Sequence, residues 1–570
     1  MFSEITVKIT GEAGQGMQTV GFNLCRLFKK YGFYIFANQD YMSRIRGGNN
    51  FFQLRVSGVP VYTLRKHSDI IIALDGPSIS IHKETLNKEG VIIIDKKKFN
   101  IVEEGPFLDV GMYEIAKNLG SEIFINSVAY GFIAGMVNAE ENFVTETIKE
   151  SFNDKGEDII GKNIAAAKSG YELAKAGIKN DKFHIEAKKT KETMIINGNE
   201  AIALGAIRSG CKFYSAYPMT PSTSIMNEIA QHSKQFNIIV EQAEDEIAAI
   251  NMAIGASFAG ARSMTATSGG GFCLMVEGVS LSAMTETPVV IVDAQRPAPA
   301  TGFPTRTEQA DLLFVLSAGH GEFAKAIFSP GSIEEAFYLT MHAFNLSEKY
   351  QIPVFIMTDQ HLADSYRNID RLNQNAANVV RSIITKELSK KISGYKRYEL
   401  NENGISARAI PSWIDDVIYA DSDEHTEEGH ITEDALMRIK MVEKRMHKKM
   451  QALKKEIIKP NIFNLEKAQI VLVGFGSTYG VLRELCEAYP DKFGFIHFSQ
   501  IWPFPADSII ELLKDKSKVA TVENNATAQL AKLIRMQTGI NISNSILKFD
   551  GRPFDLDCLA DELKVLEKAG

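Results

Sequence analysis

The chain has 570 residues, of which 45% are hydrophobic and 23% charged, with a formal net charge of −7 at pH 7. This composition predicts a large globular protein, and the acidic balance argues against a nucleic-acid-binding protein. No apolar run is long enough for a transmembrane helix, and the first residues lead into a strand pattern without a signal peptide. The five cysteines are scattered and form no C-x-x-C pair, which argues against a zinc or iron–sulfur site in this chain and is typical of the reducing cytoplasm.

The first part of the sequence alternates strand and helix patterns. The apolar "ITVKIT" leads into the glycine-rich "GEAGQG" and then into "MQTVGFNLCRLFKKYG", and further strands read "DIIIALD" and "GVIIID". This alternation predicts an α/β unit with a parallel sheet. The glycine loop departs from the dinucleotide-binding pattern G-x-G-x-x-G, so a phosphate-bearing ligand and a plain turn both remain open. The same two alternatives hold for the basic turn "SRIRGGNN".

Five near-continuous apolar strands are predicted in the second part of the chain, with helical patterns between them. Runs of this kind are typical of a parallel sheet that is covered by helices on both faces. They span residues 211–217, 237–242, 263–268, 288–295 and 353–359.

The pattern weakens in the third part. The acidic "YADSDEHTEEGHITED" precedes "ALMRIKMVEKRMHKKMQALKKEI", which reads as one long, highly charged helix, and α/β alternation resumes at "AQIVLVGFGSTYG". We therefore expect an α/β protein of three parallel-sheet domains joined by a helical, charged linker. The expected domains are 1–185, 190–385 and 461–570, and the linker is 386–460.

Polar residues follow the strands of the second part at the points where the strands end. In chain order these segments are Tyr217–Thr220, Glu241–Glu246, Ser268–Gly271 and Gln295–Arg296. Because the carboxyl ends of parallel strands lie along one edge of a sheet, we expect the four loops to converge on one crevice.

Glu246 begins a helical pattern in which its i+3, i+4 and i+7 neighbours are Ala249, Ile250 and Ala253. A carboxyl on such a small, apolar face resists ionisation, so it is expected to stay protonated or to pair with a base. The alternative is a first-turn glutamate that is favoured by the helix dipole and has no further role.

Two further features of these loops suit an anion. Arg296 follows an apolar strand. If it lies in a crevice, its planar guanidinium can bind both oxygens of a carboxylate substrate. The alternative interpretation is a surface arginine without a ligand. The three glycines in "TSGGGF" let backbone N–H groups approach an anion at a helix N-terminus, or make a flexible turn.

Three blocks of the second part resemble one family. "YPMTPSTS", "EDEIAAINMAIGASFAGARSMTATSGGGF" and "QRPAPATGFPTRTEQADL", in this order, resemble the α subunit of the 2-oxoacid:ferredoxin oxidoreductases. The N-terminal "GEAGQG" and "SRIRGGNN" resemble the γ domain of the same family. The C-terminal "VGFGSTYG", "WPFP" and "VENN" resemble a domain related to the transketolase C-terminal domain. The resemblance covers nearly the whole chain, as a fused γ–α subunit.

The resemblance implies a thiamine diphosphate enzyme that oxidatively decarboxylates a 2-oxoacid, with coenzyme A and ferredoxin as acceptors, or runs the reverse reaction. Thiamine catalysis needs a carboxyl group hydrogen-bonded to the aminopyrimidine ring, and Glu246 matches that position. Thr220 and Arg296 match residues that hold the substrate, and Arg306 is a candidate for a distal carboxylate. For the cofactors the resemblance points to Ser268 and Gly269 for thiamine diphosphate, and to Gly14, Gln15, Gly16 and Arg46 for coenzyme A.

The sequence departs from the family pattern at several loop positions. Ala13 and Gly270 replace a glycine and a proline, and Ala298 and Ala300 replace a glycine and a serine. Since the later changes lie in substrate loops, the substrate stays open: 2-oxoglutarate is the first expectation, and pyruvate, branched-chain oxoacids and indolepyruvate are alternatives. Outside enzymes, the alternative is a scaffold that binds coenzyme A or a nucleotide.

Part of the expected active site is absent from the sequence. Thiamine diphosphate also requires a Gly-Asp-Gly motif for Mg²⁺ and the diphosphate, and iron–sulfur clusters require clustered cysteines, but the sequence contains neither. We therefore expect no metal ligands in this chain and a separate β subunit that brings Mg²⁺ and a [4Fe–4S] cluster. The family implies activity only with that subunit, in an (αβ)2 heterotetramer of anaerobic metabolism.

Overall fold

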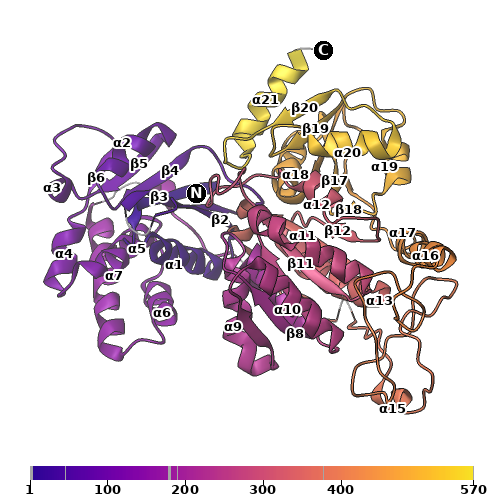
Figure 1. The fold of residues 1–570 in the computed structure, drawn as a ribbon. Coiled ribbons are helices and arrows are strands. Elements are labelled where there is room, and N and C mark those ends of the chain that lie inside the picture. The colour runs from indigo at the N-terminus through magenta and orange to yellow at the C-terminus, as the bar shows by residue number, and fades with distance from the viewer. Residues whose placement is uncertain (1–3, 45–46, 178–180, 189–190, 376–377, 569–570) are drawn as a thin grey trace. The chain divides into compact units, whose positions relative to one another are not determined.

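The computed structural model describes residues 4–44, 47–177, 181–188, 191–375 and 378–568. The chain forms two compact units, of which unit 1 contains Met1–Ile196, Asp364–Leu372 and Asp555–Gly570 and unit 2 contains the rest. The described strands form three sheets with helices packed on them, which confirms the predicted α/β class (Figure 1). No described helix has both the length and the apolar content that crossing a bilayer requires.

Unit 1 is built on an eight-stranded sheet in the order β6-β5-β4-β1-β3-β2-β14-β7. The first four strands in this order are parallel, as predicted, whereas β2 and β3 are antiparallel strands that the sequence pattern does not predict. Strand β14 joins this sheet from a distant part of the chain. The strands are β1 Glu4–Ala13, β2 Tyr34–Asp40, β3 Gly47–Ser57, β4 Ser68–Ala73, β5 Leu86–Ile94, β6 Phe107–Asp109, β7 Thr193–Asn197 and β14 Tyr366–Asp370.

The helices of unit 1 pack through small residues. A Cβ atom on Gly131 would overlap the carbonyl of Ala167, and one on Gly170 would overlap the carbonyl of Val128. Glycine at these positions therefore lets α5 and α7 approach closely, although it is a weak helix former. The helices are α1 Met17–Lys30, α2 Pro77–His82, α3 Lys96–Phe99, α4 Met112–Asn118, α5 Ile125–Met136, α6 Glu141–Ser151, α7 Glu157–Gly177 and α21 Leu556–Lys568.

The larger sheet of unit 2 has the order β18-β12-β13-β11-β10-β8-β9. The six strands from β12 to β9 are parallel, and the five predicted strands all form within a few residues of their expected bounds. The strands are β8 Cys211–Ala216, β9 Ile239–Gln242, β10 Arg262–Thr267, β11 Val289–Gln295, β12 Ala326–Phe328, β13 Pro353–Asp359 and β18 Gln500–Trp502.

Polar caps define where the helices around this sheet begin. Asn197 and Glu200 form a reciprocal capping box at α8, and the Asp245 carboxylate accepts a hydrogen bond from the Ala248 N–H at α10, 2.7 Å away. Such caps satisfy backbone donors that the first helical turn leaves unpaired. The helices are α8 Gly198–Arg208, α9 Thr223–Phe236, α10 Glu246–Phe258, α11 Gly269–Met284, α12 Leu312–Ser317, α13 Ile333–Tyr350 and α14 Gln360–Ala363.

The last part of unit 2 is a five-stranded sheet in the order β15-β17-β16-β19-β20, parallel except for β15. Its apolar residues join those of α10, α11 and α12 in one continuous core. The strands are β15 Asn461–Phe463, β16 Ile470–Phe475, β17 Phe493–Phe498, β19 Val519–Glu523 and β20 Asn544–Leu547, and the helices are α18 Tyr479–Ala488, α19 Ala506–Leu513 and α20 Gln529–Thr538.

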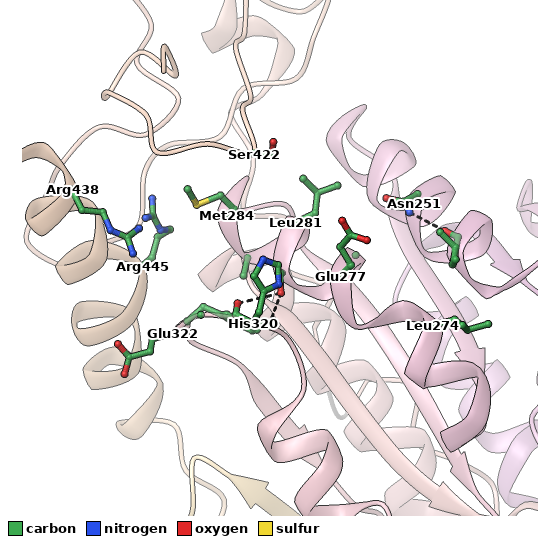
Figure 2. A pocket seen from close by; sticks show the side chains of 16 residues that line it. Asn251, Leu274, Glu277, Leu281, Met284, His320, Glu322, Ser422, Arg438 and Arg445 are labelled. Carbon is green, nitrogen blue, oxygen red and sulfur yellow. Dashed lines mark hydrogen bonds between the residues drawn. The ribbon is translucent and has the colours of Figure 1, made fainter. Parts of the chain in front are cut away.

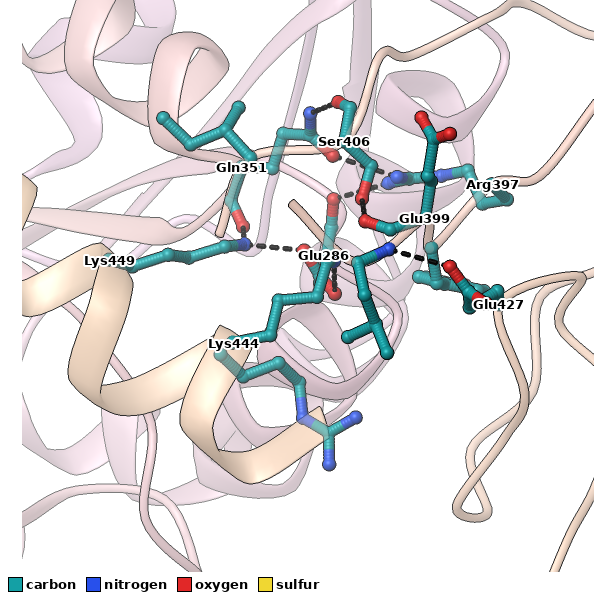
Figure 3. Close-up of polar contacts among 12 residues, drawn as sticks. Glu286, Gln351, Arg397, Glu399, Ser406, Glu427, Lys444 and Lys449 are labelled. Carbon is teal, nitrogen blue, oxygen red and sulfur yellow. Dashed lines mark hydrogen bonds and ion pairs between the residues drawn. The ribbon is translucent and has the colours of Figure 1, made fainter. Parts of the chain in front are cut away.

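The connector between the two sheets of unit 2 carries the predicted charged helix. It is one helical run made of α16 Ala435–Val442, a π-helical stretch Glu443–Lys448 and α17 Lys449–Lys454, after a short α15 Lys386–Ser389. Its charge is not all at the surface: Lys444 and Lys449 are buried and both pair with the carboxylate of Glu286 (Figure 3). The Arg397 guanidinium donates a hydrogen bond of 2.7 Å to the backbone carbonyl of Glu286.

Candidate functional site

The loops after β8, β9, β10 and β11 meet at the carboxyl edge of the larger sheet, as the parallel order requires. The Arg296 guanidinium donates a hydrogen bond of 2.7 Å to the carbonyl of Thr220. The Thr267 hydroxyl donates to the sulfur of Met219 over 3.8 Å. These contacts tie the first loop to the third and fourth, so the predicted convergence of the loops is confirmed.

Glu246 is the first residue of α10 and is only 3% exposed. Ala249, Ile250 and Ala253, which share its helix face, are fully buried. Burial raises the pKa of the Glu246 carboxyl above its ordinary value, and the nearby Asp245 adds to the shift. Its Oε1 atom is buried and has no hydrogen-bond partner among the described residues. The side chain is therefore a buried carboxyl that resists ionisation and has a hydrogen-bonding atom without a partner among the described residues.

The "TSGGGF" glycines form the first turn of α11, and none of them has a positive φ. Of the two readings of this segment, the flexible turn is excluded. Glycine is required at Gly271 for another reason: a Cβ atom there would overlap the Glu246 carboxyl and the Thr267 hydroxyl. Ser268 precedes the helix, and its buried hydroxyl has no partner in the part of the chain that the structure describes. The first turn of α11 thus packs closely against the Glu246 side chain.

Arg296 is half-buried at the end of β11, and burial lowers the pKa of its guanidinium. Among the described residues only its Nη1 has a hydrogen-bond partner, the Thr220 carbonyl, so other N–H donors remain for an anion. Thr220 is itself half-buried, in a turn whose next carbonyl, that of Pro221, accepts a hydrogen bond of 2.8 Å from Asn199. Thr220 and Arg296 are therefore brought together, as expected from the sequence.

Arg306 is buried ten residues further along the same loop. Its backbone N–H donates 3.1 Å to the Phe303 carbonyl, and its aliphatic stem lies against Gly551. The neighbouring Thr307 N–H donates to the Gly551 carbonyl over 3.3 Å. These contacts anchor the loop to the chain that follows β20, and a substrate role for Arg306 stays a prediction.

The glycine loop of unit 1 begins α1. Gly14 and Gly16 have φ of 92° and 79°, which favours glycine, and a Cβ atom on Gly14 would meet only open space. The Gln15 side chain closes the turn by accepting a hydrogen bond of 2.8 Å from the Glu12 N–H. Open space before a helix N-terminus suits an anion. Arg46, the remaining coenzyme A candidate, lies outside the described residues.

Sequence reasoning missed residues that only the fold brings to these loops. In unit 1 the Asn126 amide lies where a Cβ atom on Gly16 would be, and its buried Oδ1 has no partner among the described residues. In unit 2, Asp311 lies against Gly269. Nothing in the local sequence links these positions, which are separated by tens of residues.

A large cavity lies beside this site and not in it. It measures about 640 Å³ and opens on the outer face of α10 and α11 (Figure 2). Figure 2 shows Arg438 and Arg445 on one side, Glu277 and Asn251 on the other, and His320 between them. Glu246 does not line it, although the next residue, Ile247, does. The cavity and the predicted site residues are therefore separate features of unit 2.

Comparison with known families agrees with this geometry in all three parts of the chain. Residues 204–444 match "Pyruvate flavodoxin/ferredoxin oxidoreductase, thiamine diP-bdg". Residues 6–173 match "Pyruvate ferredoxin/flavodoxin oxidoreductase", and residues 468–558 match "Pyruvate:ferredoxin oxidoreductase core domain II". The fold and site thus define a subunit of a thiamine-dependent oxidoreductase.

Relatives that match nearly the whole chain identify the family more closely. The "2-oxoacid:ferredoxin oxidoreductase subunit alpha" of Sulfolobus sp is 34% identical over 99% of this chain and 97% of the relative. The "2-oxoglutarate oxidoreductase subunit KorA" of Mycobacterium tuberculosis is 27% identical over 98% of this chain and 90% of the relative. The solved 2-oxoglutarate:ferredoxin oxidoreductase from Magnetococcus marinus, with 2-oxoglutarate, coenzyme A and succinyl-CoA bound, is 30% identical, covers 99% of this chain and 100% of its own, and has a TM-score of 0.91.

The chain belongs to the 2-oxoacid:ferredoxin oxidoreductase family, as an α subunit with a fused γ domain at its N-terminus. The resemblance stated from the motifs is therefore confirmed. The site residues also fit the aminopyrimidine ring of thiamine diphosphate, because burial raises the pKa of the Glu246 carboxyl, its Oε1 has no partner among the described residues, and Gly271 lies against it.

Proposed function

We propose that this chain is the γ–α subunit of an enzyme that oxidatively decarboxylates a 2-oxoacid to acyl-coenzyme A and CO₂ while reducing ferredoxin, or catalyses the reverse. Glu246 carries the proposal. It is a buried acid whose pKa is raised by burial and whose Oε1 has no partner among the described residues. A structural glutamate at a helix start would instead be expected to ionise near the positive end of the helix dipole.

Each site residue has a proposed task. Glu246 donates a hydrogen bond to the aminopyrimidine ring, and its neutral form keeps the proton at the carboxyl. Ser268 and Gly269 line the cofactor space, and Arg296 pairs with the substrate carboxylate while its Nη1 stays bonded to Thr220. When bound, thiamine diphosphate supplies the electron sink for decarboxylation. The apolar face around Glu246 keeps water away from this carboxyl.

We propose 2-oxoglutarate as the first substrate to test. Support comes from the full-length similarity to an enzyme with bound 2-oxoglutarate, and from Arg306 on the loop that begins with Arg296. A dicarboxylate has two anionic ends, so two arginines on one loop suit it better than a monocarboxylate. Pyruvate, branched-chain oxoacids and indolepyruvate are the comparison substrates.

Coenzyme A is the proposed ligand of unit 1. The glycine loop offers the N-terminus of α1, open space at Gly14 and the unpartnered Asn126 Oδ1 among the described residues. Coenzyme A carries phosphates that helix N-termini bind well. A strict requirement for coenzyme A in the assay below tests this assignment.

A β subunit is the proposed partner, because the sequence lacks the Gly-Asp-Gly motif that would complete the cofactor site. Ile247, Met252 and Leu274 on α10 and α11 are 40–49% exposed although they are large and apolar. Such side chains are typical of a surface that a partner covers. We expect the partner to bring Mg²⁺ and a [4Fe–4S] cluster, to reduce ferredoxin and to form an (αβ)2 assembly. Slower amide hydrogen exchange in α10 and α11 on complex formation measures this contact.

The test is coexpression with a candidate β subunit that carries Gly-Asp-Gly and clustered cysteines. The lone chain should be colourless and inactive, and the complex should be brown and reduce a viologen dye only with a 2-oxoacid and coenzyme A. Glu246→Ala should lower turnover by about 10²–10⁴-fold, the usual range for losing a proton-transfer group. The matched control is Glu244→Ala, which removes an exposed carboxyl two residues away.

Three outcomes would count against the proposal. Activity of the lone chain contradicts a site shared with a partner. Full activity of the Glu246→Ala complex contradicts the role of this carboxyl. Failure of every 2-oxoacid with the complete complex favours a scaffold that binds coenzyme A or a nucleotide.

A further inference from the structure

An ionisable residue lies in the middle of the apolar strand β11. Asp293 is fully buried, and neither of its carboxylate oxygens has a hydrogen-bond partner among the described residues. A buried carboxylate without a partner is strongly disfavoured, so the side chain is expected to be neutral. The reaction proposed above does not use this residue.

A second acid, Asp311, links the same strand to the glycine loop. Its backbone N–H donates a hydrogen bond of 3.0 Å to the side chain of Gln295, which lies on the same face of β11 as Asp293. A Cβ atom on Gly269 would overlap the Asp311 carboxylate. Asp311 therefore lies against the first turn of α11, where the positive end of the helix dipole favours a negative charge.

The surroundings of the two acids disfavour a second negative charge. Burial, with the charge of Asp311, raises the pKa of Asp293 well above its ordinary value. Burial raises the pKa of Asp311 to about 6, and Glu308 adds to this shift. Titratable groups near the pair are Glu308 on the preceding loop, the thiol of Cys273 on α11 and Asp359, which pairs with Gln295 across the sheet, and none of them offers a positive charge.

We infer that Asp293 and Asp311 are a coupled acid pair that carries one proton at neutral pH and positions the Ser268–Gly271 loop against Glu246. Loss of that proton would leave two buried negative charges at the same end of the sheet, since Asp293 pairs with Thr267 and Asp311 lies against Gly269, two residues further on. Their repulsion is relieved most directly by moving Asp311 and the helix turn that it touches, since Asp293 is held within a central strand. Gly271, two residues after Gly269, lies against the Glu246 carboxyl, so this movement would disturb the cofactor site.

The effect on thiamine diphosphate rests on the proposed function, whereas the protonation of the pair does not. The pair positions other groups, so its expected signature is a pH dependence and not a simple loss of activity. Raising the pH through the second ionisation of the pair should weaken thiamine diphosphate binding, by about tenfold for each pH unit beyond it.

The first test uses Asp293→Asn, which keeps the shape of a neutral acid but has no proton to lose. Because other buried acids such as Glu200 also have a raised pKa, the test is the infrared difference spectrum of the natural sequence minus this variant, which should show the carbonyl band of one protonated carboxyl at neutral pH. Calorimetric titration of the cofactor-depleted complex with thiamine diphosphate should show binding by the natural sequence that weakens over the pH range in which this band disappears. The variant should bind equally well across this range.

The matched control is Glu200→Gln, since burial also raises the pKa of Glu200, to about 7, but on α8 and away from the glycine loop. It should leave the pH dependence of cofactor binding unchanged. Asp311→Asn is the second variant, and it should let Asp293 ionise at a lower pH because one negative charge is gone. If Asp293→Asn fails to fold, the pH at which Asp293 ionises in Asp311→Asn tests the inference instead.

The inference is overturned if the difference spectrum shows no protonated-carboxyl band, or if cofactor binding by Asp293→Asn follows the same pH dependence as that of the natural sequence. It is also overturned if the band titrates at the same pH with and without Asp311. If the complex binds no thiamine diphosphate at any pH, the proposed function fails, and the infrared result still decides the protonation of the pair.

Discussion

At the scale of single residues, the close contact between Gly271 and Glu246 yields a sharp prediction. Gly271→Ala would place a methyl group on the Glu246 carboxyl, whereas the same change at Gly270 meets no atom closer than the Ala300 carbonyl at 3.9 Å. We expect Gly271→Ala to weaken thiamine diphosphate binding by about tenfold or more, because overpacking typically costs about 1–3 kcal/mol. Equilibrium binding to the complex measures this, and equal affinities of the two variants would contradict the contact.

Arg296 provides a second prediction at this scale. Arg296→Lys keeps the charge but loses the planar fork that can hold a carboxylate while bonded to the Thr220 carbonyl. Loss of a hydrogen bond to a charged group costs about 1.5–3 kcal/mol, so kcat/KM for the 2-oxoacid should fall by about 10- to 100-fold. Arg483→Lys, which alters an exposed ion pair with Glu487, is the control and should change nothing. An unchanged kcat/KM in Arg296→Lys would contradict a role for Arg296 in substrate binding.

At the scale of secondary structure elements, the connector helix is held by one buried anion. Glu286 faces Lys444 and Lys449, and all three side chains are shielded from water. Glu286→Ala should destabilise the chain by about 3–5 kcal/mol, because it leaves buried cations without their partner. Lys444→Met should cost much less, since Lys449 still neutralises Glu286. Chemical denaturation compares the two, and similar losses would show that charge pairing does not anchor the connector.

The same cluster predicts a pH dependence of stability. Burial lowers the pKa of Lys444 to about 7, below its usual value of 10.5. Between these values the unfolded chain binds the extra proton, so the free energy of unfolding should rise with pH from about 7 to about 10 through this group. The rise is at most about 1.4 kcal/mol per pH unit. Lys444→Met should lack this contribution, and a parallel pH profile of both proteins by denaturant unfolding would refute it.

At the scale of the whole molecule, Gln309 connects the substrate loop to the five-stranded sheet of unit 2. Its buried side chain donates to the Phe475 carbonyl over 2.9 Å and accepts from the Asn524 N–H over 3.1 Å. Gln309→Ala would leave these buried groups without a partner, at a cost of about 1–3 kcal/mol for each. We expect faster amide hydrogen exchange in β16 and β19, with α9 as the internal reference. Unchanged exchange would show that the loop and the sheet hold their positions independently.

The division of the chain into functional domains remains a proposal at this scale. The sequence predicts four segments, whereas the structure groups the chain into two compact units. Strand β14 and helix α21 come from the second and last predicted segments and pack in unit 1. Limited proteolysis of the chain can show which of these boundaries are physically accessible.

Much of the fold could be predicted because apolar strands and helical periods are local signals. The parallel strands of the larger sheet and the start of α10 at Glu246 follow from such patterns. Strands β2 and β3 could not, since their register depends on pairing with β1 and their sequence is not strongly apolar. The charged helix was predictable, but the burial of Lys444 was not, because its partner Glu286 lies 158 residues away.

The candidate site likewise has features that the sequence predicts and features that only the tertiary structure shows. By itself, the sequence determined the α/β class, the family, and the loops that carry Thr220, Glu246 and Arg296, because motif order and the parallel-strand rule are properties of the chain alone. Only the tertiary structure decided that Gly271 lies against Glu246 and that Asp311 lies beneath Gly269. Close packing and burial set the pKa of each acid, and these depend on atoms brought together from distant parts of the chain.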